Sequence, residues 1–250
     1  MAFADFDLDY TVGNSGALAN QPNADAFLNA SLASPLTTSG IYCRQFTHTT
    51  LADASNHTSE LKAEIKASVS GGDFVDTPST KALSLRVRAR LDHDAGSLNT
   101  LTNAYAGINA YAPTGTDFSG GYELVLQNEG TNGVRLALRA GNLIDNADAG
   151  IRNPSINHQV TCTGVYGLDS WFHLRMDIVP NGVNQKTITA FTSVDDGATW
   201  QQVGQLVATN IDSFWRTTGR CGFISLLSAT SGGAGFNNYL DDFEAFVEDV

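Results

Sequence analysis

The chain has 250 residues, of which 42% are hydrophobic and 16% are charged, so it can bury a core and is not disordered throughout. Its formal net charge of −12 at pH 7 repels phosphate backbones and anionic lipid surfaces, which argues against nucleic acid and membranes as partners. No run of eighteen apolar residues is present, so we expect no membrane-spanning helix.

A two-residue hydrophobic period runs through most of the chain and predicts β-strands. In each run, apolar side chains alternate with polar ones, so one face of the strand is buried and the other is solvated. Such runs cover residues 60–69, 83–91, 122–127, 134–139 and 171–178, although Val125 in the third run is also apolar. The first run is also compatible with a helix, because Glu, Lys and Ala are good helix formers, but its strict alternation favours a strand.

Short turn motifs separate the predicted strands. Asn132-Gly133 and Asn181-Gly182 each stand between two alternating runs, which predicts two β-hairpins. Two long polar stretches, residues 92–120 and 140–170, hold few regular signals, and we interpret them as loops. Loops of this length commonly serve function or pack on a neighbouring chain.

Apolar strand signals reach both ends of the chain, at Phe3 and Phe6 and again at Phe243 and Phe246. No linker rich in Pro, Gly and Ser divides the sequence. We therefore predict a single domain, residues 1–250, whose terminal strands pair or lie close together. Eight or more antiparallel strands with long connections predict an all-β fold in which two sheets pack face to face.

The three cysteines, Cys43, Cys162 and Cys221, are far apart and lack C-x-x-C spacing. This pattern predicts buried thiols rather than a disulfide framework or a zinc site, and a single disulfide with one thiol left over is the alternative. The first residues contain neither a basic segment nor an apolar one, so we expect no secretory signal and synthesis in a reducing cytoplasm.

Four short motifs follow one another along the chain: Phe3-Ala4-Asp5-Phe6-Asp7 with Gly16-Ala17-Leu18, Ser59-Glu60-Leu61-Lys62-Ala63-Glu64-Ile65, Trp171-Phe172-His173-Leu174-Arg175-Met176, and Tyr239-Leu240-Asp241-Asp242-Phe243-Glu244. Together they resemble strands of the concanavalin A-like or laminin-G-like jelly-roll domains found in phage virion and bacterial proteins. The resemblance covers essentially the whole chain and implies a two-sheet antiparallel jelly-roll β-sandwich. It implies a function less narrowly, because this fold hosts lectins, glycan-binding modules, glycosidases and virion parts.

The segment from Ser193 to Trp200 fits the Asp-box pattern S-x-D-x-G-x-T-W at every fixed position. The Asp195 carboxylate is expected to accept backbone N–H bonds across a tight turn, Gly197 to take a positive φ, and Trp200 to pack under the hairpin. The pattern repeats in sialidase propellers but occurs once here. We therefore interpret Ser193, Asp195, Gly197, Thr199 and Trp200 as a structural turn.

The sequence contains none of the catalytic patterns that this fold or other hydrolases would lead one to look for. Glycosidases need two carboxylates across the scissile bond, and the retaining glucanases of this fold carry them as E-x-D-x-x-E or E-x-D-x-E, which does not occur. The motifs G-x-S-x-G and H-E-x-x-H do not occur either. We therefore predict that the protein is not an enzyme.

Arginines recur on the polar faces of the predicted strands. Arg86, Arg88 and Arg90 share one face, where like charges repel unless partners neutralise them, and Glu60 and Glu64 supply these partners if their strand is the neighbour. The arginines form either an ion-paired, solvated surface or a groove for an acidic or hydroxyl-rich glycan. The candidate ligand-binding residues are Arg86, Arg88, Arg90, Arg135, Arg139, His173 and Arg175, and the candidate stacking or interface aromatics are Tyr105, Tyr111, Tyr166 and Trp215.

The resemblance also implies a metal site, because members of this superfamily often hold a structural Ca²⁺ near the terminal strands. Asp241 and Asp242, with Asp5 or Asp7, are the candidate oxygen ligands. The alternative is that these carboxylates only form hydrogen bonds in loops and caps. No other cofactor is predicted.

Two main functions and a less favoured third follow from these observations. The first is a non-catalytic structural protein of a phage virion, such as a capsid decoration or tail protein. It is made in the host cytoplasm and acts as a homo-oligomer or with other virion proteins. The second is a carbohydrate-binding module that recognises a cell-surface glycan. A glycan-active enzyme is the third.

Overall fold

The computed structural model consists of β-strands and their connections in the residues that it describes, namely 6–8, 30–33, 43–48, 57–62, 74–75, 81–92, 102–112, 121–129, 133–140, 158–212, 218–229 and 236–249. Side chains are described within residues 82–91, 105–111, 121–128, 133–140, 158–212 and 238–242, and at 244. No helix long and apolar enough to cross a membrane occurs among these residues.

One sheet, here called sheet A, has eight strands. They are β1 (Phe6–Leu8), β2 (Ala30–Ala33), β3 (Cys43–His48), β6 (Lys81–Asp92), β11 (Phe172–Pro180), β12 (Gln185–Ser193), β13 (Gln201–Thr209) and β15 (Phe236–Asp249). Their order is β13-β12-β11-β6-β15-β3-β2, and β1 also pairs with β15. Every pairing in this sheet is antiparallel.

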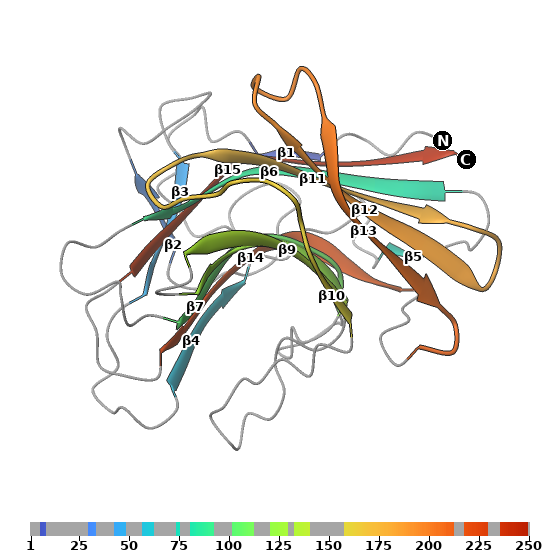
Figure 1. Ribbon diagram of the computed structural model, residues 1–250, viewed down its shortest axis with the longest axis horizontal. Helices are drawn as coiled ribbons and strands as arrows, with labels where there is room; N and C mark the ends of the chain where they lie inside the picture. The colour runs from blue at the N-terminus through green and yellow to red at the C-terminus, as the bar shows by residue number, and fades with distance from the viewer. Residues whose placement is uncertain are drawn as a thin grey trace.

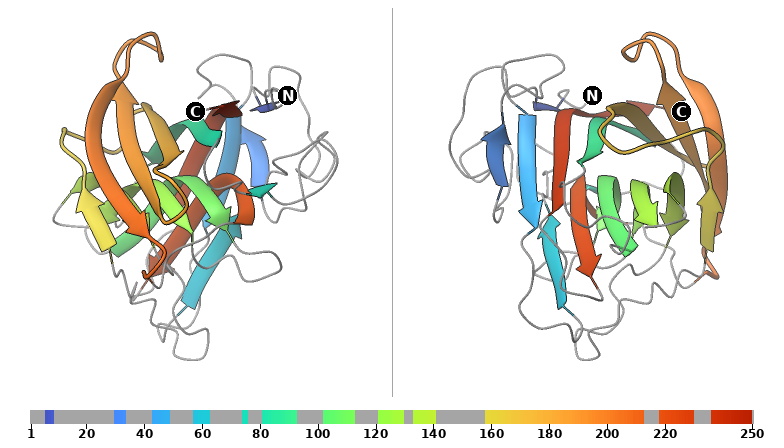
Figure 2. Two further views of the ribbon diagram at one scale, coloured as in Figure 1. Left: turned by 90° about the vertical axis from the view of Figure 1, so that its right-hand side faces the viewer. Right: turned by 60° about the vertical axis from the view of Figure 1, so that its left-hand side comes forward.

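The other sheet, here called sheet B, has seven strands. They are β4 (His57–Lys62), β5 (Phe74–Val75), β7 (Thr102–Ala112), β8 (Tyr122–Glu129), β9 (Val134–Ala140), β10 (His158–Thr161) and β14 (Thr218–Ala229). Their order is β10-β9-β8-β7-β14-β4, with β5 beside β14, and all pairings are again antiparallel. Figure 1 shows β7, β9 and β14 arched beneath sheet A, and the two views of Figure 2 confirm the two layers.

The hydrophobic core lies between the two sheets. Alternate residues of the strands supply it, including Leu85 and Val87 of β6, Leu174 and Met176 of β11, Leu124 and Leu126 of β8, and Leu136 and Leu138 of β9. Each of these side chains is at most 2% exposed. Burial of one such side chain contributes roughly 1.5–3 kcal/mol. The two-sheet antiparallel sandwich predicted from the alternating runs is therefore confirmed.

The predicted hairpins and the predicted meeting of the chain ends are also confirmed. Strand β8 pairs with β9 and β11 pairs with β12, through turns in which Gly133 and Gly182 have φ values of 82° and 75°. These left-handed conformations favour glycine. Near the ends of the chain, β1 pairs with β15 through the register Phe6 to Ala245.

The interpretation of residues 92–120 and 140–170 as loops was wrong in part. The first stretch contains β7, a central strand of sheet B, and the second contains β10 at its edge. The core face of β7 carries Ala106, Ile108 and Ala110, and its other face carries Gly107 and Asn109 beside Tyr105; alanine, glycine and asparagine have weak β preference. Pairing with β8 and β14 overrides that preference. In the first predicted run, β4 ends at Lys62, and residues 63–69 lie outside the described part.

The segment after β10 links the two sheets at one side of the sandwich. The Cys162 N–H donates to the Leu136 carbonyl of sheet B, and the Thr163 N–H donates to the Val203 carbonyl of sheet A, each at 2.9 Å. The Cys162 thiol is free and buried, and burial raises its pKa to about 12. It is therefore an inert packing group, as predicted, whereas the side chains of Cys43 and Cys221 lie outside the described part.

Candidate functional site

The structure divides the seven candidate ligand-binding residues between the two sheets. Five of them lie on β6 and β11, on the face of sheet A that points away from the core, and Arg135 and Arg139 lie on β9 in sheet B. The seven therefore do not form one groove. We call the first group, with its partners, the outer face of sheet A, namely Arg86, Arg88, Arg90, His173, Arg175 and Asp177.

On the outer face of sheet A, every arginine has a carboxylate within ion-pair distance. The pairs are Arg86 with Glu244 at 3.4 Å, Arg88 with Asp242 at 2.9 Å, Arg90 with Asp169 at 4.0 Å and Arg175 with Asp177 at 2.5 Å. The conditional pairing with Glu60 and Glu64 was wrong, because β4 lies in sheet B beside β14. The neighbours of β6 are β11 and β15.

The turn between β12 and β13 forms the hydrogen bonds that were expected of it. Asp195 Oδ1 accepts from the Thr199 N–H at 2.8 Å, and Asp195 Oδ2 accepts from the Thr199 hydroxyl at 2.6 Å. The Ser193 Oγ accepts from the Gly197 N–H at 2.9 Å, and Gly197 has a φ of 79°. Hydrogen bonds from Thr199 and Ser193 lower the pKa of Asp195 to about 2, so the turn carries a fixed negative charge at neutral pH.

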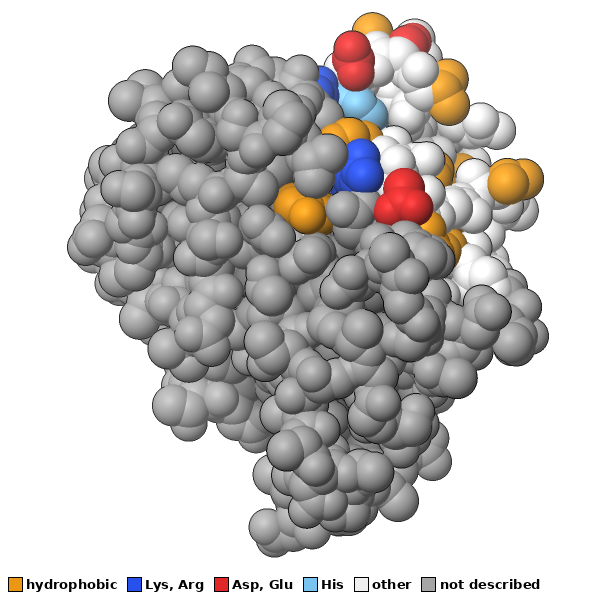
Figure 3. Space-filling view, turned by 90° about the vertical axis from the view of Figure 1, so that its left-hand side faces the viewer, with side chains coloured by type: hydrophobic (Ala, Val, Ile, Leu, Met, Phe, Trp, Pro, Cys, Tyr) orange, Lys and Arg blue, Asp and Glu red, His pale blue; other side chains and the backbone are white. Residues whose placement is uncertain are grey.

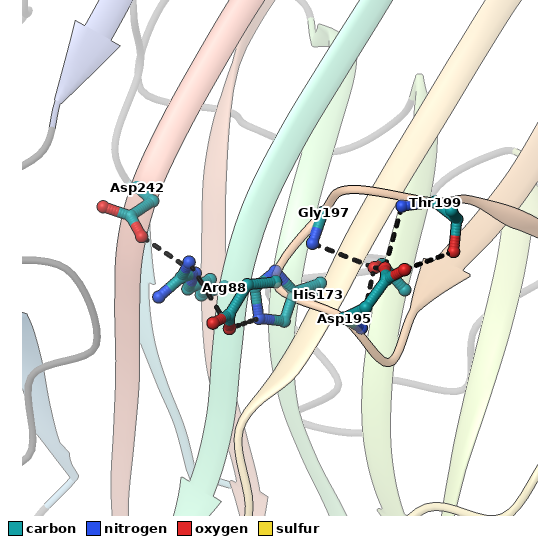
Figure 4. Close-up of polar contacts among 8 residues, drawn as sticks. Arg88, His173, Asp195, Gly197, Thr199 and Asp242 are labelled. Carbon is teal, nitrogen blue, oxygen red and sulfur yellow. Dashed lines mark hydrogen bonds and ion pairs between the residues drawn. The ribbon is translucent and has the colours of Figure 1, made fainter.

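This turn is docked on the outer face of sheet A. Asp196 Oδ1 lies 3.1 Å from His173 Nε2 and 3.7 Å from Arg88 Nη2, and Figure 4 shows the row that runs from Asp242 through Arg88 and His173 to the turn. The Trp200 ring lies under two guanidiniums, with the Cζ atoms of Arg86 and Arg175 at 5.4 and 5.9 Å from it. These contacts hold the arginines against the sheet.

His173 is neutral at pH 7 despite its acidic neighbour. Burial lowers its pKa below the usual range, and the Arg88 cation lowers it further, while Asp196 acts in the opposite sense. The neutral ring therefore donates one hydrogen bond from Nε2 to Asp196. Figure 3 shows part of the described surface, on which acidic and basic side chains lie side by side among hydrophobic ones. On this evidence the outer face of sheet A is an ion-paired surface.

One of the two carboxylates predicted as calcium ligands takes part in the same ion pairing, and the other accepts a backbone hydrogen bond from it. Asp242 Oδ2 binds Arg88, and the buried Asp241 accepts a hydrogen bond from the Asp242 N–H at 3.0 Å. Among the described residues, no group of three or more His, Cys, Asp or Glu side chains is arranged to hold a metal ion. The side chains of Asp5 and Asp7 lie outside the described part, so the calcium site stays a prediction.

A second polar cluster lies on the face of sheet B that points away from the core. The register of β7, β8 and β9 aligns its side chains in two rows across the strands. One row is Tyr105, Gln127 and Arg135, the other is Asn109, Glu123 and Arg139, and the apolar row of Gly107, Val125 and Ala137 lies between them. We call the two polar rows the polar face of sheet B. Apart from Arg135, which is partly exposed, its side chains are only 1–4% exposed.

Gln127 is the centre of the hydrogen bonds on this face. Its Oε1 accepts from Arg135 Nη2 at 3.2 Å and also from Arg139 Nη2, which reaches across the apolar row. The guanidinium of Arg139 stacks on the Tyr105 ring, with its Cζ 4.5 Å from the centroid. Glu123 Oε1 accepts from Asn109 Nδ2 at 3.1 Å.

Some buried polar atoms of this face have no hydrogen-bond partner among the described residues, namely Nε and Nη1 of Arg139 and Oδ1 of Asn109. Burial lowers the pKa of Arg139 and raises the pKa of Tyr105, because each charged form loses solvation there. Buried polar atoms are nearly always satisfied in native proteins, so such a cluster calls for a further polar partner. The polar face of sheet B is therefore the candidate functional site.

Sequence reasoning found part of this site. Arg135 and Arg139 were predicted as ligand-binding residues and Tyr105 as a stacking aromatic, and they lie together here. Asn109, Glu123 and Gln127 were missed. The alternation of Glu123 and Gln127 with core leucines placed them on one polar face, but nothing in the sequence showed that this face is buried.

No family model matches the chain, and no curated protein matches its sequence. Similar folds occur in solved structures. Lectin I from Ulex europaeus, in complex with the methyl glycoside of α-L-fucose, is 9% identical with a TM-score of 0.54, over 97% of this chain and 98% of that one. The endo-1,3-β-glucanase from Streptomyces sioyaensis is 12% identical with a TM-score of 0.54, over 97% and 95%.

A protein of unknown function from Shewanella oneidensis MR-1 is 15% identical with a TM-score of 0.52, over 100% of this chain and 88% of that one. At these identities the likeness concerns the fold alone. The narrower resemblance to phage virion domains stays a prediction. The chain has a concanavalin A-like, lectin-like jelly-roll β-sandwich fold.

Proposed function

We propose that this protein is a non-catalytic glycan-binding protein and that the polar face of sheet B holds the sugar. The observation that carries the proposal is Arg139, whose buried guanidinium has two nitrogen atoms without a hydrogen-bond partner among the described residues. A buried cation with unused donors is costly unless a ligand supplies acceptors. Sugar hydroxyls are acceptors of this kind, and a site built for them contains a few convergent polar groups.

The apolar row supports the same function. Gly107, Val125 and Ala137 lie between the two polar rows, and Tyr105 adds an aromatic ring beside them. A sugar ring presents hydroxyls at its rim and C–H groups on its faces, so it matches a surface in which polar rows flank an apolar one.

The proposed absence of catalysis follows from the acidic groups on this face. Glu123 is its one carboxylate among the described residues, and it is engaged with Asn109. Hydrolysis of a glycosidic bond by paired carboxylates needs a second acid on the opposite side of the bond. One carboxylate is sufficient for binding but not for this chemistry.

The virion role and the homo-oligomer predicted from the sequence stay predictions. They are compatible with glycan binding, because a protein on the surface of a particle can use a lectin-like face to attach to a cell. The mass of the purified chain at high concentration and its binding to capsid or tail proteins test this role. A strict monomer that binds neither would contradict it.

A glycan array tests the proposed function. The wild-type chain is expected to bind a restricted set of glycans, and Arg139→Met is expected to lose those signals. Arg86→Met removes an arginine from the outer face of sheet A instead and is expected to keep them. An array without any signal, or signals that Arg139→Met leaves unchanged, would contradict the proposal.

The same glycans test the absence of catalysis. After incubation with the protein, we expect neither new reducing ends nor unsaturated sugars. Products that appear with the wild type and disappear with Glu123→Gln would show an enzyme and overturn this part of the proposal.

A further inference from the structure

We infer that the glycan carries an anionic group, a carboxylate or a sulfate ester, and that this group binds beside Arg139 on the polar face of sheet B. The inference rests on the proposed glycan-binding function and adds the chemical class of the ligand. It starts from the acceptors that the two arginines of this face share.

Two guanidinium groups converge on one neutral oxygen. Gln127 Oε1 accepts from Nε and Nη2 of Arg135, at 3.3 and 3.2 Å, and also from Nη2 of Arg139. An amide oxygen offers two lone pairs and no net charge. It therefore cannot neutralise either cation, and it leaves no capacity for the remaining donors of Arg139.

No carboxylate among the described residues forms an ion pair with Arg139. Glu123 is its cross-strand neighbour and its negative charge attracts Arg139, but the two side chains do not form an ion pair, and Glu123 Oε1 accepts a hydrogen bond from Asn109. Arg139 is 2% exposed, so water does not solvate its charge either. A cation that is buried without a counter-ion destabilises the folded protein, and an anionic ligand removes this penalty.

The described arginines of sheet A show a different arrangement, in which carboxylates of the chain itself are the partners. On the outer face of sheet A, Arg86, Arg88, Arg90 and Arg175 each lie within 4.0 Å of a carboxylate. The chain is also strongly acidic, with 26 Asp and Glu against 14 Lys and Arg. Carboxylates are therefore abundant, yet none of the described ones forms an ion pair with Arg139, which sets it apart from these four arginines.

An anionic group on a sugar supplies the acceptors that Arg139 lacks. Oxygens of a carboxylate or sulfate accept charge-assisted hydrogen bonds, which are about twice as strong as neutral ones. The small side chains of Gly107 and Ala137 lie in the row that Arg139 crosses, next to where the sugar ring would contact the sheet. The glycan class is thus a uronic acid or a sulfated sugar.

Paired ligands test this inference by isothermal titration. An oligogalacturonate is compared with the same oligosaccharide after its carboxyl groups are reduced to alcohols, and a sulfated oligosaccharide forms a third arm. We expect one or both anionic ligands to bind at least about 10-fold more tightly than the neutral one, because hydrogen bonds to a charged acceptor are stronger than those to a neutral hydroxyl. The arm that binds more tightly identifies carboxylate or sulfate as the source.

A variant that carries its own anion gives a second test. Gln127→Glu places a carboxylate between Arg135 and Arg139, so we expect a higher melting temperature and a loss of anionic ligand binding of at least about 10-fold. Gln205→Glu adds the same charge at an exposed position of β13 and is expected to change neither. Since Gln127→Glu is expected to stabilise the fold, lost binding cannot be ascribed to unfolding.

The outcomes separate this inference from the proposed function. If neutral and anionic ligands bind equally, or if Gln127→Glu binds the anionic ligand like the wild type, the inference is overturned and glycan binding stands. If neither these ligands nor any array glycan binds, both fail.

Discussion

The outer face of sheet A and the polar face of sheet B both carry arginines, but the partners of these arginines differ. Each places arginines on one side of a single strand, at every second residue of β6 in the first case and four residues apart on β9 in the second. On sheet A each arginine forms an ion pair with a carboxylate, and the turn containing Asp195 packs on the same face. On sheet B, Arg139 meets an amide oxygen and an aromatic ring.

The number of arginines on a face therefore does not indicate whether the face binds a ligand. The partners of those arginines do, because they determine whether the positive charge is already neutralised. An ion-paired surface is already satisfied and needs no ligand. A buried cation with neutral partners is unsatisfied, and a ligand that supplies negative charge relieves the deficit. Variants that change one face and leave the other unchanged therefore test whether the two faces differ in this way.

The largest effect is expected from Gly107→Ala, in the apolar row of the polar face of sheet B. A Cβ at this position would lie 2.1 Å from the Leu124 carbonyl oxygen of β8, so β7 and β8 must separate. We expect the free energy of unfolding to fall by about 3 kcal/mol, measured by urea denaturation. Gly167→Ala, where a Cβ meets nothing within 4 Å, is the control and should be nearly neutral. Equal stability of the two variants would show that the rows are not packed as described.

The next prediction compares one arginine from each face, because we expect their removal to change the free energy of unfolding in opposite directions. Arg139→Met removes a buried charge without an ion-pair partner among the described residues and should raise the free energy of unfolding by about 1–3 kcal/mol. Arg88→Met removes the partner of Asp242 and should lower it by about 1–2 kcal/mol. Thermal and urea denaturation of both variants measure the difference. Destabilisation by Arg139→Met as large as that by Arg88→Met would mean that Arg139 is a structural residue.

A smaller loss is expected in the turn that is fastened over sheet A. Ser193→Ala removes a buried hydroxyl that accepts from the Gly197 N–H and donates to Asp195, so we expect a loss of about 1 kcal/mol. Glycan binding should not change. If Ser193→Ala weakened glycan binding as well as lowering stability, the turn and the polar face of sheet B would belong to one site, which would contradict the comparison.

Acid unfolding tests the charge on the same turn. The pKa of Asp195 is lowered in the folded state to about 2, so its contribution to stability is present above pH 4 and is lost as the pH falls toward 2. Asp195→Asn should therefore flatten the dependence of stability on pH between 4 and 2. An unchanged slope would mean that the Thr199 hydrogen bonds do not form in solution.

The smallest effect concerns His173. Its folded-state pKa is lowered, so the unfolded chain takes up a proton first as the pH falls below about 6.5, and stability declines there. His173→Gln keeps a hydrogen-bond donor for Asp196 and should weaken this decline between pH 6.5 and 5. Chemical denaturation at several pH values measures it. A steeper decline in the variant would show that His173 is charged in the folded protein.

Periodicity alone predicted most of the strands that supply the core. Residues 83–91 alternate strictly, and β6 buries the expected side. In residues 134–139 the core leucines alternate with Arg135, Ala137 and Arg139, and β9 buries both of its sides from Leu136 onward. Strand β7 was missed because alanine, glycine and asparagine carry little β preference, and its position follows from pairing with β8 and β14. Local sequence therefore identifies a strand only where its own residues favour one.

The site was harder to predict, because the partners of a side chain are set by contacts between residues distant in sequence. Alternation showed that Arg86 and Arg88 share a face, but their carboxylates come from β15 and the turn, more than 100 residues away, rather than from Glu60. Likewise, the sequence placed Arg135 and Arg139 on a polar face without showing that Gln127 joins them.

The central claim is that sugar binds to the polar face of sheet B and not to the outer face of sheet A. Its most direct test is titration of the wild type, Arg139→Met and Arg88→Met with the highest-affinity glycan found on the array. The account predicts at least about 10-fold weaker binding for Arg139→Met and wild-type affinity for Arg88→Met. Weaker binding by Arg88→Met, with Arg139→Met unaffected, would contradict it.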